Sequence, residues 1–228
     1  MTPRQRADGG GGPQWRRESG RRGSRSGPTG VASLGGEQVE GRQAVTELLR
    51  AGRRRVHQLT AVDDLDLGEI TVLASSMGLD VHRVPRMRFD ALALTAAPQG
   101  VLARADPVVA LPLDELASRP GPLVVLVGVP DPANLGAIMR SALCAGVAGL
   151  VVGQHRAVQL TPAAVKSAAG ATEHLPLSVV PGVPSALSRL SALGRWTVGL
   201  DSAGPTSLWE LPVADQPLAL VVGAEGSG

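Results

Sequence analysis

The chain has 228 residues, of which 43% are hydrophobic and 18% charged, so it can bury the core of one large or two small domains. It has no apolar run of the roughly 18 residues that span a membrane and no secretory signal at its start, which indicates a cytoplasmic protein. Cys144 is the single cysteine, which excludes a disulfide framework and a multi-cysteine zinc site, and the positive charge lies almost entirely on arginine, which suits phosphate binding but can also reflect genome composition.

Residues 1–36 form an arginine- and glycine-rich tail with few side chains to bury, and this composition predicts disorder. Seven arginines fall within the first thirty residues, opposed only by Asp8 and Glu18. The tail could therefore hold RNA phosphates loosely. A solubilising extension with no function of its own explains the composition at least as well.

Residues 37–106 alternate between helical and strand patterns and predict a small α/β domain. In "GRQAVTELLRAG" the residues Val45, Leu48 and Leu49 share one helical face, and Gly52 is a plausible stop. A second helix is predicted in "EITVLASSMG", and strands are predicted in "VHQLTAV", "DVHRV" and "GVLARA". Arginines gather at the edges of this domain, either on a solvated turn or as contacts to RNA phosphates: Arg42, Arg50, Arg53, Arg54 and Arg55.

Residues 107–120 are rich in proline and predict a linker with a short helix. From residue 121 the strand and helix patterns alternate again. Strands are predicted in "LVVLVG", "GLVVG", "LPLSVV", "RWTVGL" and "LALVVG", with helices in "NLGAIMRSALCAG", "PAAVKSAAG" and "VPSALSRLSALG". This order predicts an α/β fold with a mostly parallel sheet and helices on both faces, whose ligands bind beyond the carboxyl ends of the strands.

The first candidate site segment is "LVGVPDPANLGAIMRSALCAG", residues 126–146. Its prolines force an extended turn after the strand, and Asn134 is expected to cap the helix that follows. Arg140 lies one turn beyond Gly136 and Ala137 on the same side of this helix. Because helical side chains tilt toward the N-terminus, its guanidinium should lean over these small residues toward the strand ends. A surface arginine without a role in the site is the alternative.

The second candidate segment is "LALVVGAEGSG", residues 218–228. Its glycines let the backbone turn sharply and approach a ligand, with Glu225 at the tip of the turn. The segment lacks the spacing of dinucleotide-binding and phosphate-binding loops, and a plain turn is the alternative.

A third, weaker segment is "VKSAAGATEHLP", residues 165–176, whose small residues suggest close helix packing beside the site. Surface positions are favoured over functional roles for its polar residues Lys166, Glu173 and His174. The histidines have no partners at metal-binding spacing, so no metal site is predicted.

Together these segments resemble the SPOUT superfamily of RNA methyltransferases, in particular the SpoU/TrmH type that methylates ribose 2′-hydroxyls. "DPANLGAIMRSALCAGV" matches the first motif of that family and "LALVVGAEGSG" the second, while "KSAAGATEHLP" falls where the family has a similar small-residue stretch. Residues 37–106 resemble the ribosomal-protein-like substrate-binding domain that often precedes these motifs. The arrangement is most similar to the bacterial methyltransferases of guanosine in 23S rRNA.

The resemblance implies a homodimer that binds S-adenosylmethionine in a deep trefoil knot at the carboxyl end of the sheet and acts on RNA. Asn134 and Arg140 would have the catalytic roles. Because a guanidinium normally stays protonated, Arg140 would fix a substrate phosphate or stabilise the forming alkoxide rather than act as a base. The cofactor would contact the second motif, at Gly223, Ala224, Glu225 and Gly226.

The third motif of the family, an "SLN" stretch after an "IP" strand end, has no counterpart up to Gly228. In the family this motif supplies much of the cofactor pocket and the last part of the knot. We therefore expect residues 121–228 to form a C-terminally incomplete methyltransferase domain that binds the cofactor poorly. The alternative functions are a catalytically inactive RNA-binding protein and a general nucleotide-binding α/β protein.

Overall fold

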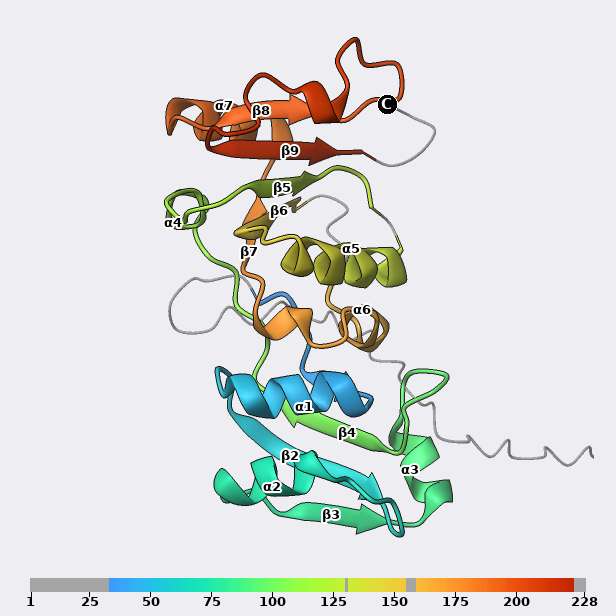
Figure 1. Cartoon of the computed structure of the whole chain (residues 1–228). Coiled ribbons are helices and arrows are strands. Elements are labelled where there is room, and N and C mark those ends of the chain that lie inside the picture. The colour runs from blue at the N-terminus through green and yellow to red at the C-terminus, as the bar shows by residue number, and fades with distance from the viewer. Residues whose placement is uncertain (1–32, 130, 155–158, 224–228) are drawn as a thin grey trace, which may run out of the picture.

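The computed structural model describes residues 33–129, 131–154 and 159–223, and these contain two β-sheets (Figure 1). We call the part built on the first sheet the small unit and the part built on the second sheet the large unit. The expected tail falls mostly on residues 1–32, which lie outside the described residues. Ser33 and Gly35, also placed in the tail by the sequence, instead form isolated β-bridges with Val109 and Leu160.

The small unit is a four-stranded mixed sheet with three helices, in the strand order β1-β4-β2-β3. Strands β1 and β2 both pair antiparallel to β4, and β2 pairs parallel to β3. The elements are β1 (Gln38–Glu40), α1 (Arg42–Ala51), β2 (Val56–Val62), α2 (Glu69–Ser76), β3 (Val81–Val84), α3 (Arg86–Leu92) and β4 (Val101–Ala105).

Helix α1 matches its prediction closely. Val45, Leu48 and Leu49 are buried, and Gly52 ends the helix in the left-handed conformation that glycine adopts readily. The pattern did not predict β1 or α3. Strand β1 is three residues long and its Glu40 is fully buried, so the strand lacks an alternating apolar pattern. The Glu40 carboxylate accepts hydrogen bonds from the backbone N–H groups of Leu94 (2.7 Å) and Thr95 (3.0 Å), which compensates its burial.

The large unit is a five-stranded sheet in the order β7-β6-β5-β9-β8, and every neighbouring pair of strands is parallel. Its elements up to the third strand are α4 (Leu113–Ala117), β5 (Leu123–Leu126), α5 (Pro132–Cys144), β6 (Gly149–Gly153), α6 (Pro162–Ser167), η1 (Ala171–Glu173) and β7 (Leu177–Val180). The remaining elements are α7 (Val183–Ala192), β8 (Trp196–Gly199), η2 (Leu208–Glu210) and β9 (Leu218–Val222).

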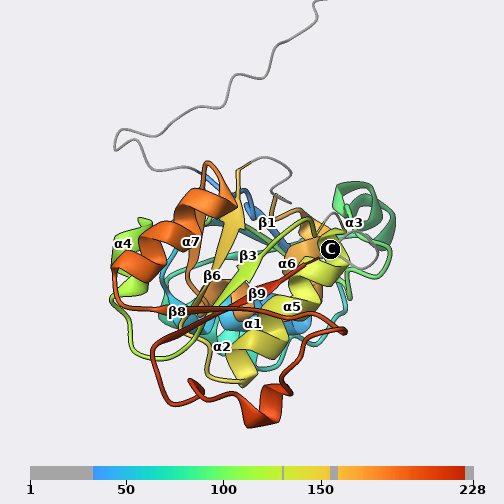
Figure 2. The same ribbon diagram turned by 90° about the horizontal axis from the view of Figure 1, so that it is seen from above.

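Two hydrophobic clusters lie on opposite faces of this sheet, because successive residues of a strand point to opposite sides. Val124 and Leu126 of β5 belong to a cluster that includes Met139 of α5. Leu123 and Val125 belong to the cluster that includes Leu190 of α7. Figure 2 shows the strands stacked between helices. The predicted mostly parallel sheet with helices on both faces is therefore confirmed.

Candidate functional site

The two site segments leave the large sheet at the same edge. Leu126, at the end of β5, pairs with Val222 at the end of β9, and the backbone N–H of Val127 donates to Val222 O at 2.9 Å. Figure 1 shows that the arrows of β5 and β9 point the same way and that α5 begins beyond the tip of β5. Gly223 is exposed, and a Cβ at this position would have no described atom within 4 Å. Gly223, the first residue after β9, is thus accessible at the edge of the sheet where β5 also ends.

The cap of α5 is Asp131 and not Asn134, so that prediction was wrong. The Asp131 carboxylate accepts from the backbone N–H of Ala133 at 3.1 Å, and Pro132 occupies the first turn. The ring of Pro132 favours this position because the first helical residues have no intrahelical partner for their N–H groups. Asn134 is consequently inside the first turn, where its side chain is exposed.

Arg140 lies in the second half of α5 and is exposed. It follows Asn134 by six positions, which places the two about 9 Å apart along the axis and about 120° apart around it. The two side chains therefore occupy different faces of one helix. Among the described residues no hydrogen bond or ion pair of the Arg140 side chain is present. Its role in the site stays a prediction.

The expectation that the Arg140 guanidinium leans over the space left by Gly136 was wrong, because Gly136 faces another helix. Gly136 is buried against α6, where an added Cβ would collide with the backbone oxygen of Ala164 and lie 2.7 Å from the N of Ala168. Ser167 also donates a hydrogen bond to Ala133 O at 2.8 Å, joining α6 to the first turn of α5. The small residues therefore serve close packing of the two helices, as the third segment suggested.

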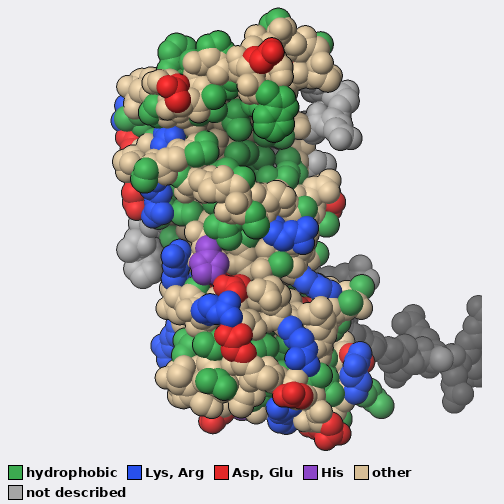
Figure 3. Space-filling view, in the orientation of Figure 1, with side chains coloured by type: hydrophobic (Ala, Val, Ile, Leu, Met, Phe, Trp, Pro, Cys, Tyr) green, Lys and Arg blue, Asp and Glu red, His purple; other side chains and the backbone are tan. Residues whose placement is uncertain are grey.

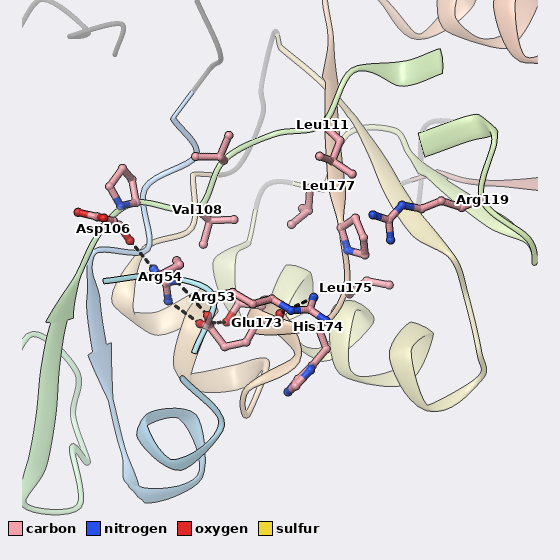
Figure 4. A pocket seen from close by; sticks show the side chains of 14 residues that line it. Arg53, Arg54, Asp106, Val108, Leu111, Arg119, Glu173, His174, Leu175 and Leu177 are labelled. Atoms are coloured by element: carbon pink, nitrogen blue, oxygen red, sulfur yellow. Dashed lines mark hydrogen bonds and ion pairs between the residues drawn. The ribbon is translucent and has the colours of Figure 1, made fainter. Parts of the chain in front are cut away.

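Glu173 is buried at the junction between the two units, so its predicted surface position was wrong. Its carboxylate accepts two hydrogen bonds from Arg54, Nε at 2.9 Å and Nη2 at 2.5 Å, and the two side chains are only 1% and 8% exposed. Arg54 is consequently not on a solvated turn. His174 of the large unit likewise lies 2.9 Å from the Glu47 carboxylate of the small unit. Figure 4 shows this junction, and in Figure 3 basic, acidic and histidine side chains lie close together on the surface at mid-height, where the two units meet.

The loop between α3 and β4 also reaches the large unit. The Nζ of Lys166 donates to Ala97 O, and Gln99 accepts a hydrogen bond from the backbone N–H of Arg42 at 2.8 Å. Gln99 has a φ of 56°, in the left-handed region that non-glycine residues seldom adopt. Lys166 therefore holds a neighbouring loop and is not a plain surface residue.

Three predicted cofactor contacts, Ala224, Glu225 and Gly226, lie outside the described residues. Within the described ranges there is no cluster of three or more His, Cys, Asp or Glu side chains able to hold a metal ion. No helix in the same ranges is both long and apolar enough to cross a membrane.

Comparison with known families matches both parts of the chain. Residues 121–228 match the SpoU rRNA Methylase family, and residues 38–109 match the family described as RNA 2′-O ribose methyltransferase substrate binding. YacO of Bacillus subtilis, assigned to the TrmH family of tRNA/rRNA methyltransferases, is 32% identical over 201 residues, which cover 84% of this chain and 80% of YacO. A protein of Staphylococcus saprophyticus assigned to the same family is 31% identical over 199 residues, 83% of this chain and 79% of its own.

Solved structures with this fold include the SpoU methyltransferase AviRb from Streptomyces viridochromogenes. It has a TM-score of 0.69 at 24% identity and matches 84% of this chain and 73% of its own. An rRNA methyltransferase from Sinorhizobium meliloti has a TM-score of 0.69 at 21% identity, over 84% of this chain and 72% of its own. Both proteins have also been solved with AdoMet bound. At these identities the likeness establishes the fold.

Proposed function

The chain belongs to the SpoU rRNA methylase family of RNA methyltransferases, and we propose that it transfers a methyl group from S-adenosylmethionine to a ribose 2′-hydroxyl of 23S rRNA in the cytoplasm. The observation that carries this proposal is the pairing of Leu126 with Val222, the last residues of β5 and β9, so that the chain leaves both strands at one edge of the sheet. Ligands of parallel sheets bind at this edge.

The second site segment fits a cofactor. Gly223 is exposed and has no described atom within 4 Å of the place a Cβ would occupy, so a ligand could approach its backbone closely, as an adenine edge or a ribose would require. We assign the cofactor contacts to this turn, at Gly223, Ala224, Glu225 and Gly226. When bound, S-adenosylmethionine supplies an electrophilic methyl group on a positively charged sulfur.

Positioning is the main task of the protein in this reaction, because the ribose oxygen must approach the methyl group in line with the breaking bond. In this transfer the hydroxyl would give up its proton to solvent as the oxygen–carbon bond forms, and the methyl–sulfur bond would break to leave S-adenosylhomocysteine. Arg140 would hold the adjoining phosphate or stabilise the developing negative charge on the oxygen. Asn134, exposed in the first turn of α5, would contribute a hydrogen bond at the same edge.

The proposal divides the chain by function. The methyltransferase domain is residues 121–228, the substrate-binding domain is residues 37–106, and residues 107–120 connect them. The match of residues 38–109 to a substrate-binding family supports RNA binding by the small unit. The enzyme would act as a homodimer, as the resemblance of the motifs implies.

Transfer of tritiated methyl groups to bacterial 23S rRNA tests the reaction, and alkaline hydrolysis then tests the position. A 2′-O-methyl group blocks cleavage of the adjoining phosphodiester, so the label should appear in alkali-resistant dinucleotides. The Arg140→Ala variant should lose transfer, whereas Arg88→Ala, which changes an exposed arginine of α3, should retain it. Label on a base would contradict the proposed position, and RNA binding without any transfer would support the inactive RNA-binding alternative.

A further inference from the structure

A cavity of about 350 Å³ lies at the junction between the two units. It opens at the amino-terminal edge of the large sheet, because its wall includes Leu177, the first residue of β7, and Arg119, which precedes β5. The proposed methyl-transfer site lies at the opposite, carboxyl-terminal edge. The cavity is therefore separate from that site.

The floor of this junction pocket is apolar. It is formed by aliphatic side chains and prolines from two segments of the chain: Pro107, Val108, Leu111, Leu175, Pro176 and Leu177. Leu175 and Leu177 are each 2% exposed, so the floor belongs to the packed core. The backbone N–H of Leu111 donates to Leu177 O at 2.7 Å, which holds the two segments together. Ligand pockets are usually lined mainly by apolar side chains with a few polar groups, and such a floor can accept the face of a nucleobase.

Two arginines from different units carry the positive charge of the pocket. Arg53 precedes β2 in the small unit and Arg119 follows α4 in the large unit (Figure 4). Both are exposed. Arg53 donates a single hydrogen bond, to Glu173 O at 3.1 Å, and the Arg119 side chain has no hydrogen bond within the described ranges. Most of their N–H groups can therefore bind a ligand.

The acidic groups around the pocket are already paired. Glu173 is held by Arg54, and the Asp106 carboxylate lies 2.7 Å from His57 Nε2. His174 faces Glu47. Arg53 and Arg119 thus remain as cationic side chains without an acidic partner among the described lining residues. Guanidinium groups bind phosphate oxygens through paired hydrogen bonds.

We propose that the junction pocket binds one unpaired nucleotide of the RNA substrate, with the base against the apolar floor and the adjoining phosphate between Arg53 and Arg119. The volume lies within the range of pockets that enclose small ligands, roughly 300–1,000 Å³. The inference rests on the RNA-binding part of the proposed function. Because the pocket lies at the amino-terminal edge of the large sheet, it would hold RNA on the side of the molecule away from methyl transfer.

Fluorescence anisotropy of a fluorescein-labelled single-stranded uridine dodecamer with the full chain tests this site. Arg53→Ala and Arg119→Ala should each weaken binding about tenfold, the equivalent of roughly 1.4 kcal/mol per contact. Each should also lower the slope of log Kd against log salt by about 0.7, the value for one phosphate contact on a single strand. Arg88→Ala, the matched control on α3, should change neither quantity beyond a general loss of charge.

A charged residue introduced at the rim of the pocket tests the same site without altering the core. Val109 lines the pocket and is 55% exposed, so both Val109→Glu and Val109→Lys should fold. The glutamate should weaken dodecamer binding and the lysine should preserve or strengthen it. Equal effects of both rim changes, or equal effects of the arginine variants and the Arg88 control, would overturn the proposal.

Uridine monophosphate serves as the probe for a free nucleotide. Weak competition, in the millimolar range, supports an RNA site, whereas micromolar binding that Arg119→Ala abolishes would overturn it in favour of a free-nucleotide site. The measurement needs no methyl transfer, which separates it from the proposed reaction. If the unchanged protein binds no RNA, the proposed function fails together with the inference. If the unchanged protein binds RNA and the pocket variants bind it equally well, the inference alone fails.

Discussion

Replacing Glu173 with alanine would leave the Arg54 guanidinium at the junction without its carboxylate. The two side chains are 1% and 8% exposed, and the pair makes two hydrogen bonds of 2.9 and 2.5 Å. Removing one partner of a buried pair costs about 3–5 kcal/mol, mainly because a charge remains in a poorly solvated place. Arg54 would keep its hydrogen bonds to Gly36 O and Asp106 O, at 2.9 and 2.8 Å. We therefore expect a loss near the lower limit, about 3 kcal/mol.

Urea unfolding of the full chain, followed by circular dichroism, measures this loss. With a slope of about 3 kcal/mol/M, the midpoint of Glu173→Ala should fall by about 1 M. Asp90→Ala is the control, because it removes an exposed ion pair with Arg86 in which the side chains are 51% and 69% exposed. Such a pair contributes about 0–1 kcal/mol.

A double-mutant cycle separates the pair from the rest of the junction. The double variant Arg54→Met with Glu173→Leu removes both charges. Its loss of unfolding free energy should be clearly smaller than the sum of the losses for Arg54→Met alone and Glu173→Leu alone. A Glu173→Ala loss below about 1 kcal/mol, or single effects that simply add, would refute the reasoning that the two units are joined by a coupled buried pair.

Three further changes test the local structure. Gly136→Ala should destabilise the protein by about 1–3 kcal/mol in urea unfolding, because the new Cβ would meet the backbone of α6. Gly199→Ala is the control and should be nearly neutral, since a Cβ there has open space. Equal effects of the two changes would contradict the packing of α5 on α6. Asp131→Ala should lower the free energy of unfolding by about 1 kcal/mol, because α5 loses its cap. Asp131→Asn should lower it much less, since asparagine also caps helices, and equal losses would contradict the capping role. The hydrogen bond from Arg189 holds the pKa of Asp114 below its ordinary 3.8. The folded protein therefore binds fewer protons at this carboxylate than the unfolded chain, so any stabilisation is present above about pH 4 and is lost as the pH falls through the folded pKa. Arg189→Met should raise this pKa toward 3.8 in an NMR titration, and an unchanged value would exclude the proposed cause.

Much of the fold could be predicted because the local patterns are strong. The helix of α1 was evident from three apolar residues on one face and a glycine stop, and the parallel sheet from the alternation of strands and helices. The missed β1 shows the limit of such patterns. Its Glu40 is fully buried because the N–H groups of residues 94 and 95, which are 54 and 55 residues away in the sequence, satisfy its carboxylate.

The candidate site was predicted in part, for a similar reason. The motifs identified the two segments, and the register of β5 with β9 places the ends of these strands side by side. The choice of Asn134 as the cap was wrong because Asp131, three residues earlier, precedes a proline that already begins the helix. The role of Gly136 could not be read from its own helix, since the atoms that require a glycine there belong to α6.

The sequence by itself determined the order of the elements, the faces that they bury and the family to which the chain belongs, because these depend on residues a few positions apart and on continuous motifs. Only the tertiary structure decided that Arg54 meets Glu173 across 119 residues and that a pocket forms between the two units. The physical reason is that the free energy of a buried charge depends on the partner that the fold brings to it, and a local pattern carries no information about that partner.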